Sequence, residues 1–405
     1  MPALGCSTLV TARSADLPVR SPATPEIVRD AVVAWEDETI TYAGHRAGWD
    51  GPIDEDASGR AVVPGFVDCH THLPFFGWRD DEYEDRLGGA RYGEQGGILR
   101  SARMLAEASD DDVLAFCRPL LEEMLTHGTT AVEMKTGYGL SVETELRQAR
   151  LARRLADEVP QTVTVTLLGC HAVPSGGTSE EWVDAVCTEL IPAAAAGGLA
   201  DAVDVYVEDI AFTVADLERV AEAAATHGLP LRCHADQLGP SGAAEAAARL
   251  GARSADHLNH TDTGGVRALG GGDTMAVLLP ASTLLLGESR PPVAELREAG
   301  AAIAVATDLN PGTSPVLSMP EAITLGCALY RLPPAEALLA ATVNAAWVLG
   351  LHDRVGSLVP GNRADLLVLD APDPRMIPYR PGHNPVAEVV VGGVLHHRSQ
   401  SGGRG

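Results

Sequence analysis

The sequence has 405 residues, enough for a barrel-sized domain of about 250 residues with a smaller domain beside it. It carries 30 basic and 55 acidic residues, a formal net charge of −25, and no Lys or Arg cluster that could form a phosphate-binding stripe. This balance argues against nucleic acids and membranes as partners, and we expect a soluble protein that acts on a small molecule.

Nothing in the sequence indicates export. Its first residues lack the basic and apolar blocks of a secretory signal, and no apolar run approaches the roughly 18 residues of a membrane span. The seven cysteines form no C-x-x-C pair, which favours the reducing cytoplasm over a disulfide framework. Cys69, Cys170 and Cys233 each precede a histidine. Because neighbours on a strand face opposite sides, we expect these thiols in the packing.

The two ends of the chain have a β-like pattern. Residues 1–60 contain "TLVTA" and "DAVVAWEDETITYAG", and residues 355–405 contain "ADLLVLD" and "VAEVVVGGVLHH", which are short apolar runs between turn residues. Neither end alone has enough strands for a stable sheet. We expect the two ends to combine into one small β-sandwich-like domain.

Between these ends, residues 61–354 alternate short apolar runs with helical patterns, which indicates a parallel α/β sheet. Eight units of this kind favour a closed (β/α)8 TIM-type barrel over an open sheet. The eight expected strands are Ala61 to Val67, Thr130 to Met134, Thr162 to Leu168, Ala202 to Val207, Leu229 to Cys233, Ala252 to Ala255, Thr274 to Leu279 and Ala302 to Thr307.

The expected strands end in polar side chains, and active sites of such barrels lie at the carboxyl ends of the strands. In chain order these residues are His70, His72, Glu133, Lys135, Tyr138, His171, Glu208, His234, His257 and Asp308.

His70 and His72 are spaced i, i+2, which places both imidazoles on one face of a strand. Alone, this spacing is a weak signal, since a hydrogen-bonded pair of histidines would also fit. Together with His234 and Asp308 it predicts a site for Zn or Fe with three nitrogen ligands and one oxygen ligand. His257 could hold or accept a proton of an acidified water. The alternative for His257, and more strongly for His171, is a satisfied core histidine.

Several motifs resemble the amidohydrolase superfamily, namely "VVPGFVDCHTHLPF", "HADQ", "SADHL" and "ATDLNPG". More narrowly, "FGWRDDEYEDRLGGARY", "GGILRSAR", "GTTAVEMKTGYGL", "LGCHAVP", "AVLLP" and "TDLNPGTSP" together resemble the imidazolonepropionase family. The resemblance runs from about residue 61 to residue 365 and touches every strand end.

This resemblance implies hydrolysis of 4-imidazolone-5-propanoate to N-formimidoyl-L-glutamate in histidine degradation. One divalent or trivalent ion, Zn or Fe, would be bound at the positions of His70, His72, His234 and Asp308. The implied substrate contacts are Arg79, Tyr138, His171, Gln237, Asn310, Gly312 and Thr313. By its own chemistry, Arg79 can bind a carboxylate through two hydrogen bonds. The alternative is an exposed arginine paired with its acidic neighbours.

His257 and Asp308 are the expected proton carriers, and Gln237 or Asp236 is expected to steer the ring. Many members of the family are expected to have a Glu at one of these last two positions, so the pair Asp236-Gln237 is a departure. Two-metal relatives bridge their ions with a carboxylated lysine at a mid-barrel strand, whereas the only lysine here, Lys135, follows the second strand. One metal ion is therefore expected.

Two other functions compete with this interpretation. An amidohydrolase for a related cyclic amide, or a nucleobase deaminase, would use the same metal site, but a free base offers no carboxylate to Arg79. A catalytically inactive scaffold would be expected to lack a ligand, whereas all four candidates are present. By analogy with similar barrels we expect a homodimer.

Overall fold

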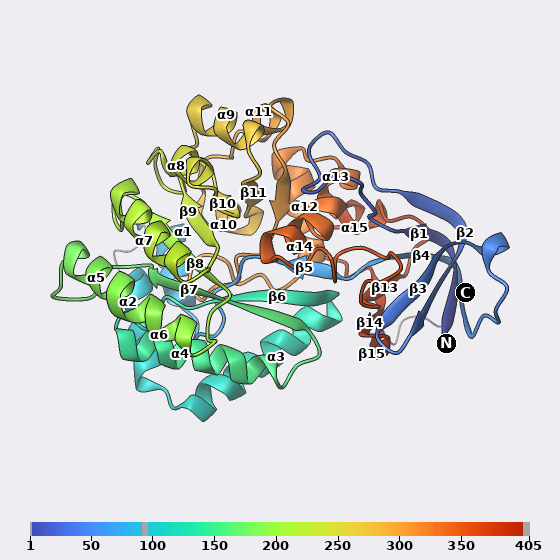
Figure 1. The fold of residues 1–405 in the computed structure, drawn as a ribbon, viewed down its shortest axis with the longest axis horizontal. Coiled ribbons are helices and arrows are strands. Elements are labelled where there is room, and N and C mark those ends of the chain that lie inside the picture. Colours follow the sequence, from blue (N-terminus) through green and yellow to red (C-terminus); the bar gives the residue numbers. More distant parts are fainter. Residues whose placement is uncertain (1, 91–95, 400–405) are drawn as a thin grey trace.

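The computed structural model describes residues 2–90 and 96–399, which form two sheets (Figure 1). The larger sheet has eight strands in the order β5 to β12, and each pair of neighbours is parallel. Its strands are β5 (Phe66–Asp68), β6 (Thr129–Lys135), β7 (Thr162–Cys170), β8 (Ala202–Val207), β9 (Leu231–Ala235), β10 (Ser254–His257), β11 (Met275–Leu278) and β12 (Ile303–Val305). The sequence prediction of an eight-stranded parallel barrel is thus confirmed.

The sheet closes on itself just beyond its two outermost strands, β12 and β5. Thr71 and Leu309 form a parallel bridge, the Asp308 N–H donates to the His70 carbonyl at 3.0 Å, and the His72 N–H donates to the Leu309 carbonyl at 2.8 Å. These bonds tie together the segments that follow β5 and β12. Residues that follow the first and the last strand of the barrel therefore become neighbours.

Helices connect the strands and cover the outside of the barrel (Figure 1). They are α1 (Asp80–Leu87), α2 (Gly97–Glu107), α3 (Asp110–Thr126), α4 (Val142–Ala156), α5 (Ser179–Ala185), η2 (Val186–Leu190), α6 (Ile191–Ala196), α7 (Val214–Thr226), α8 (Ala243–Arg249), α9 (Thr263–Gly271), α10 (Pro280–Leu286), α11 (Val293–Glu298), α12 (Met319–Tyr330), α13 (Pro334–Ala340), α14 (Val343–Leu349) and α15 (Met376–Tyr379). Hydroxyl caps begin several of them, as where the Thr213 side chain accepts from the Asp216 N–H at α7. No helix of the described ranges is both long and apolar enough to cross a membrane.

The two ends of the chain share the smaller, seven-stranded sheet, whose order is β15-β14-β13-β4-β1-β2-β3. Its strands are β1 (Ala3–Val10), β2 (Ile27–Glu36), β3 (Thr39–His45), β4 (Glu55–Pro64), β13 (Leu366–Leu369), β14 (Val386–Val391) and β15 (Val394–Arg398), with the short helix η1 (Arg46–Gly48) after β3. Apolar side chains from both ends, including Leu9, Val33, Val62 and Leu366, form one buried cluster. The predicted pairing of the two termini is thereby confirmed.

The strand expected from Ala61 to Val67 is in fact divided. Residues 61–64 complete β4, which pairs with β1 and β13 of the smaller sheet, and the barrel strand β5 begins only at Phe66. Gly65 joins the two strands, and a Cβ there would lie 2.0 Å from Thr130 Oγ1. The apolar pattern runs unbroken across this junction, which is why the sequence did not reveal the change of sheet.

Candidate active site

Four polar side chains converge at the carboxyl ends of the barrel strands. His72 Nε2 lies 3.4 Å from His234 Nε2 and 3.3 Å from Asp308 Oδ1, and His70 Nε2 lies 3.5 Å from the same oxygen. A tetrahedral Zn²⁺ site with bonds of about 2.0–2.1 Å has ligand atoms about 3.3–3.4 Å apart. All four side chains are buried. Their spacing therefore fits one small metal ion, as the sequence spacing predicts.

Unpaired atoms support the same fit. Buried polar atoms normally have hydrogen-bond partners, yet His70 Nε2 and Asp308 Oδ1 have none among the described residues. A lone pair that is buried without a hydrogen-bond donor is available to bind a metal ion.

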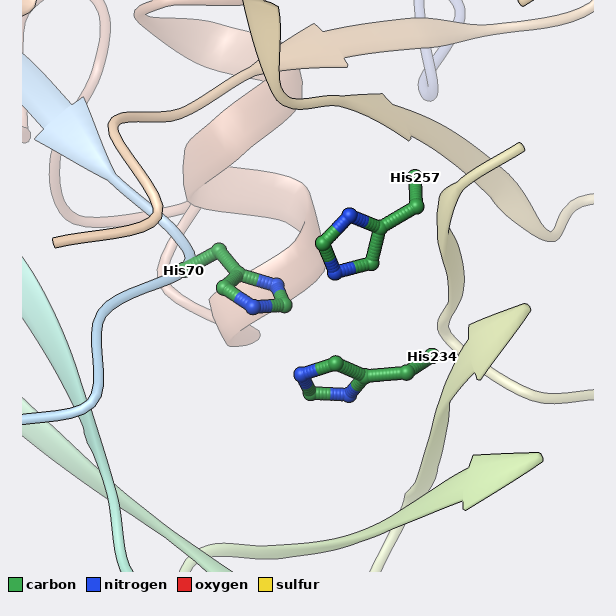
Figure 2. A group of neighbouring side chains, drawn as sticks. All are labelled: His70, His234 and His257. Atoms are coloured by element: carbon green, nitrogen blue, oxygen red, sulfur yellow. The ribbon is translucent and has the colours of Figure 1, made fainter. Parts of the chain in front are cut away.

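His257 lies beside two of these residues, His70 and His234 (Figure 2). Its ring centroid is 5.5 Å from that of His70 and 5.2 Å from that of His234, and the three rings face a common space. One nitrogen of each of these three rings lies within 4.8 Å of the others. The same holds for one ligand atom each of His70, His72 and Asp308. His257 is thus close enough either to bind an ion or to contact a molecule held by the other four.

Two buried carboxylates orient the histidines from behind. His70 Nδ1 lies 2.6 Å from Asp256 Oδ2, and His234 Nδ1 lies 3.1 Å from Asp204 Oδ2. The hydrogen bond to Asp256 keeps the proton of His70 on Nδ1 and leaves its Nε2 lone pair free for a metal ion, and the charge of Asp204 favours the same arrangement in His234. Sequence reasoning missed this role of Asp204 and Asp256. Their signal was a carboxylate inside an otherwise apolar strand, in "AVDVYV" and "SADH".

Burial favours the neutral form of His70, His72 and His257. It lowers the pKa of His70 and His72 well below the usual value, and neighbouring cationic groups add to this effect. Burial also lowers the pKa of His257 to about 3, although Asp308 opposes the change. Neutral imidazole is the form that binds metal ions and accepts protons.

Two of these residues have an uncommon backbone. His257 has φ +77° and Asp308 has φ +56°, in the left-handed region that non-glycine residues rarely adopt. Such conformations persist where the surrounding structure holds them, and they are enriched at functional sites. Here His257 is the last residue of β10 and Asp308 lies three residues after β12, and both side chains line the pocket of the site.

A pocket opens over these groups, and it contains most of the residues singled out from the sequence. It is lined by His72, Arg79, Ile98, Tyr138, His171, Tyr206, His234, Gln237, His257, Asp308, Asn310 and Thr313. Ile98 and Tyr206 were not anticipated, because apolar and aromatic residues in helices and strands give no separate signal.

Arg79 is buried rather than exposed. It precedes α1, its side chain is 2% exposed, and its Nη1 donates to Glu82 Oε2 at 3.2 Å. The alternative of an exposed arginine is therefore wrong, although one acidic neighbour does pair with it. Its Nε has no partner among the described residues. The residue lines the pocket, where a guanidinium can bind an anion.

A buried carboxylate shapes the loop that carries Tyr138. Glu145 accepts hydrogen bonds from the N–H groups of Gly137, Gly139 and Leu140 at 3.0, 2.7 and 3.0 Å. The loop in turn holds His171, whose Nδ1 lies 3.0 Å from the Gly137 carbonyl. Since a carbonyl only accepts, that nitrogen carries the proton, and Nε2 remains an acceptor.

The amide of Asn310 is used within its own loop. Its Oδ1 accepts from the N–H groups of Gly312 and Thr313 at 2.9 and 2.7 Å, and its Nδ2 donates to the Asp308 carbonyl at 2.7 Å. Asn310 therefore shapes the turn that follows Asp308. The resemblance implies substrate contacts for Asn310, Gly312 and Thr313, and these bonds fix where the loop lies relative to the pocket.

Asp236 and Gln237 have different contacts. Asp236 Oδ1 accepts from the Ser241 hydroxyl at 2.7 Å and Oδ2 from the Thr261 hydroxyl at 2.9 Å, so this carboxylate holds loops together. Gln237 lines the pocket instead. Of the two, only Gln237 is placed to contact a ligand.

The sequence of this chain is similar to those of known proteins. A model of the amidohydrolase family matches residues 61–395. Imidazolonepropionase of Rubrobacter xylanophilus is 47% identical over 387 residues, which are 94% of this chain and 92% of the relative. Imidazolonepropionase of Cupriavidus pinatubonensis is 44% identical over 391 residues, with 93% and 92% covered. The chain belongs to the imidazolonepropionases of the amidohydrolase family. The recognition made from the motifs is thereby confirmed.

Solved structures add support for the fold of this amidohydrolase. An adenosine deaminase of Xanthomonas campestris with bound zinc superimposes with a TM-score of 0.72 at 21% identity, covering 97% of this chain and 92% of that one. Guanine deaminase of E. coli also gives a TM-score of 0.72, at 16% identity, covering 98% and 100%. Identities this low support the barrel architecture and nothing about the substrate.

Proposed function

We propose that this chain is a metal-dependent hydrolase that opens the ring of 4-imidazolone-5-propanoate to give N-formimidoyl-L-glutamate. The observation that carries the proposal is the convergence of His70, His72, His234 and Asp308 at metal-ligand spacing beneath a pocket that also holds Arg79. The family membership supports the substrate, because close relatives bear the name imidazolonepropionase.

The metal ion, Zn or Fe, would lower the pKa of a bound water and polarise the carbonyl group of the ring. His70, His72, His234 and Asp308 would hold it. One ion is preferred because Lys135 lies between carboxylates, 2.7 Å from Asp204 Oδ2 and 3.0 Å from Glu133 Oε2. A carboxylated lysine at that place would add a further negative charge to an already anionic cluster.

The protein's own groups would bind and orient the substrate. The propanoate carboxylate would face the guanidinium of Arg79, and Gln237, Tyr138 and His171 would hydrogen-bond the polar ring. Burial of the pocket residues would exclude bulk water and strengthen each of these contacts. Arg79 would thus favour an acidic substrate over a free base.

Proton movement would fall to His257 and Asp308. Water would add to the ring carbonyl carbon, and the bond between this carbon and the ring nitrogen would break. The nitrogen must then take a proton, and the carbonyl carbon becomes the carboxylate of the product. Burial lowers the pKa of His257 and raises that of Asp308, and both residues line the pocket, so both would be placed to exchange protons with the reacting groups.

We further propose that the hydrolase barrel runs from β5 to about residue 354, that the chain before β5 and the chain from residue 355 onward form the small domain, and that the protein acts in the cytoplasm as a homodimer. Common dimerisation of similar barrels supports the last point by analogy. Light scattering of the purified protein tests it.

The decisive experiment generates imidazolonepropionate in place from urocanate with urocanase. We expect loss of the imidazolone ultraviolet band, appearance of formimidoylglutamate, and abolition of both in His70→Ala. Persistence of the imidazolone with a metal-loaded protein would contradict the substrate assignment.

A pair of arginine variants separates the acid substrate from a nucleobase. Arg79→Ala should raise KM by about 100-fold without lowering metal content. The matched control is Arg100→Ala, since Arg100 also contacts Glu82, at 3.6 Å, but does not line the pocket. An equal effect of both changes would contradict the role of Arg79.

A further inference from the structure

The single lysine of the chain lies in a buried charge cluster beneath the candidate metal ligands. Lys135 ends β6, and its Nζ lies 2.7 Å from Asp204 Oδ2, 3.0 Å from Glu133 Oε2 and 3.9 Å from Asp256 Oδ2. All four side chains are 0% exposed. A fully buried ammonium group is costly unless it is paired, so its position among three carboxylates requires an explanation.

Two of these carboxylates are the ones that orient the histidines. Asp256 Oδ2 lies 2.6 Å from His70 Nδ1, and Asp204 Oδ2 lies 3.1 Å from His234 Nδ1. In both cases the oxygen that faces the imidazole is the oxygen nearest to Lys135. The ammonium group therefore sits where it controls the position of both histidine partners at once.

We propose that Lys135 is a positioning residue that fixes Asp204 and Asp256 and, through them, aims Nε2 of His234 and His70 at the metal ion. This inference rests on the metal site of the proposed function and adds a residue that touches neither the metal nor the substrate. Its backbone supports the same role, because the Lys135 N–H donates to the carbonyl of Thr71, the residue between His70 and His72, at 2.9 Å.

The physical basis is charge compensation in the barrel interior. Without Lys135, the carboxylates of Glu133, Asp204 and Asp256 would face Arg232 as the cation within the cluster, and Arg232 forms its ion pair with Glu133. Asp204 would then lose its ion pair with the lysine, Asp256 would keep only the charge of Arg232, and the two carboxylates would move apart. Loss of the groups that orient metal ligands typically lowers metal affinity by about 10- to 100-fold.

Arg232 provides a matched control. It is buried in the same cluster and its charge acts on Asp256, but its hydrogen bonds go to the Thr166 hydroxyl at 3.0 Å and the Val348 carbonyl at 3.2 Å. Replacing either cation by methionine removes one buried positive charge and leaves a side chain of similar length. Only the Lys135 variant removes the contacts to Asp204 and Asp256.

The test measures metal affinity rather than turnover. Zinc-loaded parent, Lys135→Met and Arg232→Met are titrated with a chromophoric zinc chelator, and their cobalt-substituted forms are compared by visible absorption. We expect Lys135→Met to lose about 10- to 100-fold in zinc affinity and to change the cobalt d–d bands. Arg232→Met should stay within about threefold of the parent, with an unchanged spectrum.

Equal effects of the two changes, or none in Lys135→Met, would overturn the inference while leaving the metal site in place. A parent protein that binds no metal would instead refute the proposed function. If Lys135→Met does not fold, the comparison is made in an Asp204→Asn background, where no unpaired carboxylate remains at that position. There, the added Lys135→Met change should alter zinc affinity much less, and a fully additive loss would again overturn the inference.

Discussion

Gly312 packs directly against the guanidinium of Arg79. A Cβ at position 312 would lie 1.8 Å from Arg79 Nη2 and 2.3 Å from Cζ. Arg86 holds the same loop, since its Nη2 donates to the Gly312 carbonyl at 2.8 Å. The loop after β12 and the arginine before α1 therefore fit together only with glycine at this position.

Gly312→Ala should displace Arg79 without touching the metal ligands. We expect kcat/KM for the imidazolone substrate to fall by about 10- to 100-fold, or roughly 1.4–2.7 kcal/mol, with most of the change in KM. Metal content should stay at the parent value. Gly271→Ala at the end of α9 is the control, because a Cβ there meets no atom within 4 Å. An unchanged KM in Gly312→Ala would show that the guanidinium does not bind substrate where it now lies.

Removal of the metal should destabilise the protein, because an ion that binds only the folded state adds to its stability. Dialysis against a chelator should lower Tm and abolish activity, and added Zn²⁺ should restore both. In His72→Ala we expect Zn²⁺ to produce no rise in Tm. His260→Ala should behave like the parent, since His260 pairs with Glu288 at 3.0 Å outside the site. A zinc-dependent Tm in His72→Ala would remove that residue from the ligand set.

Glu145 should prove essential for the loop that carries Tyr138. Glu145→Ala leaves the N–H groups of Gly137, Gly139 and Leu140 without their acceptor, and we expect a loss of about 3 kcal/mol or more in the free energy of unfolding. Glu145→Gln keeps one acceptor oxygen and should lose less. Urea denaturation measures both changes. Equal stability of the two variants would contradict a role of the retained oxygen as an acceptor.

Glu208 should lower the free energy of unfolding as the pH rises from 4.5 to about 7. Burial raises the pKa of this carboxyl from 4.5 to about 7, although the Leu238 and Gln237 N–H groups oppose the shift. Between these two values the folded state binds more protons than the unfolded state, so each rise in pH favours unfolding. The contribution is present below pH 4.5 and is lost as pH rises to about 7.

Glu208→Gln should therefore flatten the pH profile of the free energy of unfolding, measured by urea denaturation from pH 4.5 to 8. Glu222→Gln, at an exposed position of α7, is the control and should follow the parent. Parallel profiles for Glu208→Gln and the parent would refute the raised pKa.

The candidate metal ligands could be predicted because their signals are local. The i, i+2 spacing of His70 and His72 and the polar residues that end apolar runs are visible without any three-dimensional information. The same holds for Arg79, Tyr138, His171 and Gln237, which the motifs place at strand ends and which the structure brings into one pocket.

Residues that contact the candidate metal ligands, and not the pocket itself, were harder to predict. Asp204 and Asp256 lie in strands whose other residues are apolar, and a buried carboxylate there has no meaning until its partner is known. The resemblance implies a substrate contact for Asn310, and only the structure shows that its amide also bonds within its own loop. Side chains of the same chemistry thus differ in role according to contacts across the barrel.

The sequence by itself determined the eight-stranded barrel, the shared sheet of the two termini and the type of chemistry. These features depend on periodicity, on strand count and on residue types at strand ends, all of which are local. Only the tertiary structure decided where the chain leaves the small sheet at Gly65 and how Lys135 pairs with Asp204 and Asp256. Such pairings join residues 69 and 121 positions apart, and closure of the barrel, rather than local preference, brings them into contact.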